Sequence, residues 1–179
     1  VGFPVECFLR AEDGELRNNR ISGTTGMAGV LVSGKNWRIL GNVISGFRKE
    51  CIAAPAENVV IHGNHCLGTS ADGKNVIYAF YNPGAKGTHL IAENRLVPAA
   101  GAQRGIRYDG VSANVVIRGN TIMGTGGHCI SGGTTIADNW SESCGQFGIV
   151  SDSAALSISR NTILNAGGEG IYLSGSGVI

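Results

Sequence analysis

The stretch Val115-Val-Ile-Arg-Gly-Asn-Thr-Ile122 decides the fold, because similar stretches recur along the 179-residue chain. Among them are Ile39-Leu-Gly-Asn-Val-Ile44, Val59-Val-Ile-His-Gly-Asn-His-Cys66 and Leu156-Ser-Ile-Ser-Arg-Asn-Thr-Ile163. In each, alternating apolar residues predict a short strand that ends at the asparagine, and a second short strand that leaves it. The corner asparagines are Asn19, Asn42, Asn64, Asn94, Asn120, Asn139 and Asn161.

A third apolar stretch follows each corner by about ten residues, as in Ile52-Ala-Ala54, Ile77-Tyr-Ala79 and Ile106-Arg-Tyr108. A unit of three short strands cannot bury an apolar face alone, so neighbouring units must stack. The 29 glycines suit a chain that turns at every third of a coil. The sequence therefore predicts an all-β solenoid of about seven coils, each with three short strands, in a single domain over residues 1–179.

These repeats resemble the right-handed parallel β-helix superfamily, which includes pectate lyases, polygalacturonases, alginate epimerases and phage tailspikes. The resemblance covers the chain from Leu16 onward and is greatest to a tailspike or tail-fibre segment. It implies a right-handed, single-stranded parallel β-helix in which the seven corner asparagines stack as a structural ladder and bond to buried main chain. Asparagine suits this role because it both donates and accepts, and because it tolerates left-handed backbone.

The composition of the chain limits the kinds of partner and ligand that we expect it to bind. Fourteen Lys and Arg against thirteen Asp and Glu, without a basic run, predict no nucleic-acid binding. The apolar runs are too short for membrane insertion. We expect no cofactor and no metal site, because the corner at Asn64 separates His62 from His65 and Cys66. The chain stops where another coil would begin, without a polar cap, so we expect a segment of a longer protein.

The five cysteines are odd in number and show no CxxC spacing. Cys51 and Cys129 precede the third-strand isoleucine at equivalent positions, but three coils separate them, about 14 Å. Cys66 occupies a core position and is interpreted as a small buried residue. We therefore expect reduced cysteines and folding in a cytoplasm, for a protein that ends up on a virion tail or outside the cell.

The third strands carry the candidate ligand site. Strict alternation of inward and outward side chains predicts two outward rows along the third strands. The first row is given at the end of this paragraph, and the second holds Phe80, Asp109 and Asp152. We predict that Tyr78, Phe80, Arg107 and Tyr172 bind polysaccharide. The segments 69–75, 82–88 and 98–104 should wall this face. The first row consists of Leu31, Ala53, Tyr78, Arg107, Ser131, Val150 and Tyr172.

Catalytic candidates lie on the same face. Hydrolysis needs two carboxylates, and Asp109 and Asp152 are two coils apart, roughly 9.6 Å, which is near the separation of an inverting pair. Arg107 is the alternative, as the base of a β-elimination, although the pKa of arginine exceeds about 12. The signature motifs of alginate epimerases, polygalacturonases and pectate lyases are absent. Whether the chain is an enzyme, either a glycoside hydrolase or a polysaccharide lyase, stays open.

A second surface feature concerns assembly. On the strands before the corner, Val60, Leu90 and Val116 should face outward on three consecutive coils, with Leu40 beside them. Such an apolar stripe is typical of a partner surface, and with the tailspike resemblance it predicts a homotrimer. Three functions remain open: a tailspike or tail-fibre segment that binds or also cleaves a bacterial surface glycan, an exported bacterial carbohydrate-active or carbohydrate-binding protein, and a structural spacer.

Overall fold

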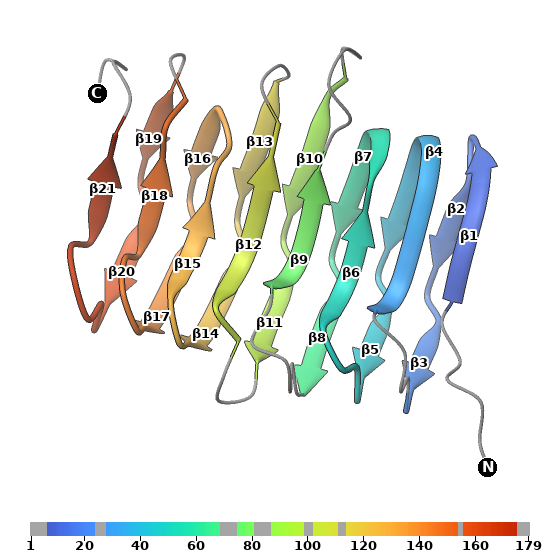
Figure 1. Cartoon of the computed structure of the whole chain (residues 1–179), viewed down its shortest axis with the longest axis horizontal. Coiled ribbons are helices and arrows are strands. Elements are labelled where there is room, and N and C mark those ends of the chain that lie inside the picture. The colour runs from blue at the N-terminus through green and yellow to red at the C-terminus, as the bar shows by residue number, and fades with distance from the viewer. Residues whose placement is uncertain are drawn as a thin grey trace.

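The structure is a computed structural model that describes residues 7–23, 28–68, 75–80, 87–98, 102–110, 114–153 and 156–174. Over these residues the chain is all β and winds into a solenoid whose long axis is horizontal in Figure 1. Each strand pairs in parallel with its counterpart one coil away, as β7 with β10, β8 with β11 and β9 with β12. The predicted fold class is confirmed.

The strands form three faces. The first face holds the strands before each corner asparagine: β2 (Glu15–Arg17), the C-terminal part of β4 (Ala28–Leu40), β7 (Ala56–His62), β10 (His89–Ala92), β13 (Val115–Arg118), β16 (Thr135–Ala137) and β19 (Ser157–Ser159). The second face holds the strands after it: β3 (Arg20–Ser22), β5 (Val43–Ser45), β8 (His65–Gly68), β11 (Arg95–Pro98), β14 (Thr121–Thr125), β17 (Trp140–Cys144) and β20 (Thr162–Leu164). The third face holds β1 (Cys7–Glu12), the N-terminal part of β4, β6 (Glu50–Ala54), β9 (Asn75–Phe80), β12 (Arg104–Asp109), β15 (His128–Ser131), β18 (Ile149–Ser151) and β21 (Ile171–Leu173).

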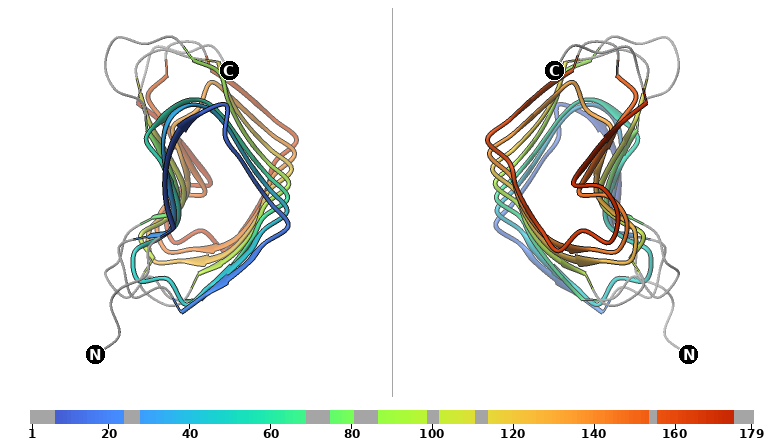
Figure 2. Two further views of the ribbon diagram at one scale, coloured as in Figure 1. Left: turned by 90° about the vertical axis from the view of Figure 1, so that its right-hand side faces the viewer. Right: turned by 90° about the vertical axis from the view of Figure 1, so that its left-hand side faces the viewer.

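Strand β4 runs without a break from the third face into the first, so these two faces share one 14-stranded sheet. The second face is a separate 7-stranded sheet with one strand per coil, close to the number of coils expected. Figure 2 shows the coils end-on, lying over one another around a closed outline.

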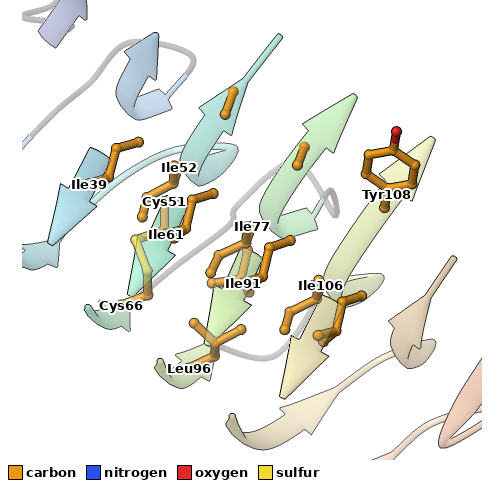
Figure 3. Close-up of a cluster of buried hydrophobic side chains, with 14 of the residues drawn as sticks. Ile39, Cys51, Ile52, Ile61, Cys66, Ile77, Ile91, Leu96, Ile106 and Tyr108 are labelled. Atoms are coloured by element: carbon orange, nitrogen blue, oxygen red, sulfur yellow. A yellow bond between two sulfur atoms is a disulfide. The ribbon is translucent and has the colours of Figure 1, made fainter. Parts of the chain in front are cut away.

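The core consists of columns of aliphatic side chains inside this outline. Ile52, Ile77 and Ile106 come from the third face, Ile61 and Ile91 come from the first, and all five are fully buried (Figure 3). Burying such a side chain contributes about 1.5–3 kcal/mol. Because a slip of one residue would turn a whole column toward solvent, the columns hold the coils in register.

The predicted asparagine ladder is present. The main-chain N–H and Nδ2 of Asn64 both donate to Oδ1 of Asn94, at 2.9 and 3.0 Å. Nδ2 of Asn94 donates in turn to Oδ1 of Asn120 and to the carbonyl of Ile61. The same relation links the column from Asn19 to Asn161.

One of the two reasons for expecting asparagine in the ladder, its tolerance of left-handed backbone, was wrong. The left-handed residue is the one before each ladder asparagine, such as Gly63 at φ +66° or Glu93 at +56°. Among the described residues, no ladder asparagine has a positive φ. The ladder therefore selects asparagine for its amide group alone.

Left-handed backbone does select side chains at a second corner, which the sequence analysis missed. Asp13, Asn36 and Asn58 have φ between 50° and 58°, a region that Asn and Asp tolerate best. Nδ2 of Asn36 donates to Asp13 at 2.7 Å, and Nδ2 of Asn58 donates to Asn36 at 2.9 Å. Each of the three lies six residues before a ladder asparagine, so the spacing was a usable signal.

The expectation of reduced cysteines was wrong. Cys51 of β6 is bonded to Cys66 of β8, and Cys129 of β15 to Cys144 of β17, each pair 15 residues apart. The error came from comparing equivalent cysteines of different coils, whereas the bonded partners face each other across a single coil. Since disulfides persist in oxidising compartments, these two point to an extracellular protein rather than to one that folds in a cytoplasm.

Candidate ligand-binding face

The outer surface of the third face presents the first predicted row. Strand register aligns Tyr78 with Arg107, and continues through Ser131 and Val150 to Tyr172. Tyr78 and Arg107 are half-buried, whereas 43% of Tyr172 is exposed. The register thus makes this row one continuous strip along the solenoid.

A polar cluster of Tyr78, Arg107 and Asp109 joins two neighbouring strands of this face, β9 and β12. Nε of Arg107 donates to Oδ1 of Asp109 at 2.8 Å, and the Tyr78 hydroxyl donates to Oδ2 at 3.1 Å. The Arg107 guanidinium also lies over the Tyr78 ring, 5.2 Å from its centroid. Each side chain therefore holds the other two in place.

Protonation in the polar cluster follows from these contacts. Burial, and then the neighbouring Asp109 carboxylate, raise the pKa of Tyr78. The hydrogen bond to Asp109 raises the pKa of Arg107. Tyr78 thus keeps its proton as a hydrogen-bond donor, and Arg107 is held as a cation, which disfavours its use as a catalytic base.

Strict alternation fails at the start of the third-face strands. In β9, β12 and β15 two successive residues are buried, as in Val76-Ile77, Gly105-Ile106 and Cys129-Ile130. The residues before these pairs form a further row in register across the coils, in which Arg104 and His128 are half-buried whereas Asn75 is only 3% exposed. This row includes Asn75, Arg104, His128 and Phe147, which the sequence analysis missed because it assumed period-two alternation throughout.

An aromatic stack of His128, Phe147 and Tyr172 occupies the C-terminal part of the face. The His128 and Phe147 rings are 5.1 Å apart and 6° from parallel. The Phe147 and Tyr172 rings are 4.9 Å apart and 14° from parallel. Aromatic rings of this kind offer apolar surface together with polar tips, so the stack complements the polar cluster.

The structure does not bring every predicted site residue into the polar cluster. Asp152 is exposed just after β18, two coils from β12, and Tyr172 joins the aromatic stack. Phe80 pairs with Asp109 in register, but its side chain lies outside the described residues. Of the walls predicted at 69–75, 82–88 and 98–104, residues 69–74, 82–86 and 99–101 also lie outside the described residues. Catalysis stays a prediction, which Asp109→Asn and Asp152→Asn would test by the loss of any polysaccharide cleavage.

Two other kinds of feature are absent from the described part of the chain. No group of three or more His, Cys, Asp or Glu residues there could hold a metal ion. No helix in that part is long and apolar enough to cross a membrane.

The sequence model of the family described as "Right handed beta helix region" matches residues 7–134 and 89–179. No curated protein matches the chain. Among solved structures, the chain is similar to the Streptococcus pneumoniae surface protein and adhesin PfbA, with a TM-score of 0.59 and 15% identity. That match covers 90% of this chain and 49% of the other, so this chain spans about half the length of that structure. At such low identity the likeness shows the fold alone.

Proposed function

The chain belongs to the right-handed β-helix family, and from this premise we propose that it is an extracellular protein that binds a polysaccharide along the outer surface of its third face. The family scaffold hosts many functions and does not decide among them. The observation that carries the proposal is the presence of the polar cluster and the aromatic stack on one face.

This combination matches the chemistry of a sugar chain. Sugar hydroxyls both donate and accept hydrogen bonds, and the polar cluster offers donors in the Arg107 guanidinium and acceptors in the Tyr78 oxygen and the Asp109 carboxylate. Sugar C–H groups pack on aromatic surface, which His128, Phe147 and Tyr172 supply. Four coil steps separate β9 from β21, roughly 19 Å at one strand spacing per coil. That length suits an extended chain better than a single sugar unit.

The disulfides bear on the kind of protein. A tailspike assembled in a cytoplasm would fold among reduced thiols, whereas Cys51–Cys66 and Cys129–Cys144 favour an exported protein. The similar solved structure is of a surface protein and adhesin, which agrees with binding at a cell surface. We therefore favour an exported bacterial carbohydrate-binding protein over a virion tail protein, and over a spacer without a ligand.

A glycan array with two matched variants tests the proposal. Tyr172 is 43% exposed on the third face and Trp140 is 44% exposed on the second, so Tyr172→Ala and Trp140→Ala remove equally exposed aromatic rings. We expect the wild-type protein to bind a defined set of glycans, and Tyr172→Ala to weaken that binding about tenfold while Trp140→Ala leaves it unchanged. Absence of binding to any glycan, or an equal loss in both variants, would overturn the proposal.

A further inference from the structure

The additional row contains three polar side chains on consecutive coils. Arg104 is aligned with Asn75 on one side and with His128 on the other. Each has a buried polar atom that finds no hydrogen-bond partner among the described residues: Oδ1 of Asn75, Nε of Arg104 and Nδ1 of His128. Buried polar atoms are nearly always bonded, so three adjacent exceptions indicate a place where a partner is missing.

Two basic side chains, Arg104 and His128, are neighbours on this row, whereas Glu50, which the pairing of Ile52 with Ile77 places level with Asn75, is two coils from Arg104. Asp109 pairs with Arg107, so that carboxylate is already engaged. Arg104 forms no ion pair among the described residues. Burial and the neighbouring Arg107 lower the pKa of Arg104, and burial and Arg104 lower the pKa of His128. Burial is the largest cause of both shifts and outweighs the opposing effect of Asp109 on Arg104, so an anion bound beside these residues would stabilise their cationic forms.

We propose that Arg104 and His128 form an anion subsite that binds a carboxylate or sulfate group carried by the polysaccharide. The subsite rests on the proposed function, since it selects among the glycans that the third face binds. The guanidinium of Arg104 donates to the oxyanion through charge-assisted hydrogen bonds, and the His128 ring contributes an N–H. Both residues are only partly buried, so an anion reaches them from solvent.

The position of the subsite fixes how the glycan lies. Arg104 belongs to β12, which also carries Arg107 and Asp109 of the polar cluster, whereas His128 is the first ring of the aromatic stack. The anionic group is therefore held between the hydroxyl-binding cluster and the apolar stack. Asn75 lies in the same row but is only 3% exposed, so it is not assigned a contact with the glycan.

The test uses the glycans that the wild-type protein binds on the array, each compared with two derivatives. One derivative has its carboxylates reduced to alcohols, and the other is desulfated. Calorimetry on the wild-type protein should show that one of these treatments weakens binding about tenfold, as expected for the loss of a hydrogen bond to a charged group. The treatment that has this effect distinguishes carboxylate from sulfate.

Three variants locate the effect. Arg104→Gln should bind the native glycan as weakly as the wild-type protein binds the neutral derivative, and should bind that derivative unchanged. His128→Phe keeps a ring to stack on Phe147 but removes the ring nitrogens, so it should weaken binding of the acidic form only. Arg95→Gln removes an exposed arginine from the second face and should behave as wild type.

The failures are distinguishable. If the wild-type protein binds native and neutralised glycans equally, or if Arg104→Gln weakens both forms to the same extent, the subsite is wrong and the proposed function stands. If the wild-type protein binds no glycan, the proposed function itself fails, and the subsite falls with it. Thermal unfolding of each variant shows whether a loss reflects misfolding instead, and in that case Arg104→Met, which keeps a long apolar side chain but removes the charge, replaces Arg104→Gln in the same comparison.

Discussion

At the residue scale, the ladder depends on a side chain that donates and accepts in both directions along the axis. Asn94 accepts twice through Oδ1 from Asn64, and its Nδ2 donates to Asn120 and to the carbonyl of Ile61. All of these groups are shielded from water, so a missing partner costs the desolvation of each group left behind. Each inner ladder asparagine therefore stabilises three coils at once.

Replacing Asn94 by alanine should be strongly destabilising. We expect Asn94→Ala to lower the free energy of unfolding by about 3 kcal/mol or more, because several buried donors and acceptors lose their partner. Asn19→Ala is the matched control, since Asn19 is exposed at the first coil, and it should cost less than about 1 kcal/mol. Urea unfolding measures both, and equal losses would contradict a ladder whose strength depends on burial.

His89 makes stability depend on pH. It is fully buried beside Tyr108, and burial lowers its pKa to about 4 from an ordinary 6.5. A histidine with a lowered pKa stabilises the fold fully above pH 6.5, and this contribution is lost as the pH falls toward 4. The loss amounts to about 3 kcal/mol below that pH.

The variant His89→Val tests this origin, because Val59 and Val115 occupy the same position on the neighbouring coils. Unfolding free energy measured from pH 7 to pH 4 should fall steeply for the wild-type protein and much less for the variant. The same slope in both proteins would show that another group causes the acid sensitivity.

At the element scale, the two disulfides each tie a third-face strand to the second-face strand of the next corner. The loop that each closes spans 15 residues, so in a chain-entropy account each adds about 3 kcal/mol to stability. Their third-face cysteines occupy equivalent positions, but on the second face Cys66 aligns with Ser141 through Leu96 and Ile122, whereas Cys144 aligns with Thr125. The disulfides therefore reinforce the closure of single coils, whereas the ladder and the core columns hold neighbouring coils together.

Peptide mapping checks the pairing directly. After alkylation of the denatured, unreduced protein, these four cysteines should be unmodified and should appear as Cys51–Cys66 and Cys129–Cys144 linked peptides. The double variant Cys129→Ala/Cys144→Ala should unfold at a lower temperature than the wild-type protein, and reductant should narrow this difference because it breaks the same bond in the wild type. Free thiols at these positions would contradict the extracellular assignment as well as the bonds.

At the scale of the whole molecule, the apolar stripe on the first face bears on assembly. Val60, Leu90 and Val116 are aligned on consecutive coils and half-buried, and the stripe ends at Arg38 on one side and at Thr135 on the other. Leu40 lies in the adjacent row, aligned with His62. A homotrimer formed through this stripe stays a prediction.

Sedimentation measures the oligomeric state. If the stripe is the interface, Leu90→Lys should convert the trimer to monomer, because a charge would be buried at its centre. Leu164→Lys is the control, since Leu164 is 39% exposed on the second face and lies outside the stripe. A wild-type protein that sediments as a monomer at all concentrations would remove the prediction.

The solenoid, the corner asparagines and the main outward row of the third face could be predicted from the sequence. These features repeat at a regular spacing, and a repeat can be identified wherever stacking forces equivalent residues together. The disulfides, the row of Asn75, Arg104 and His128, and the aromatic stack became visible in the folded chain alone. These features depend on which strands of the three faces lie opposite each other across one coil, and on where two successive side chains both point inward. Local alternation does not encode either property, because both arise from closure of the coil around its core.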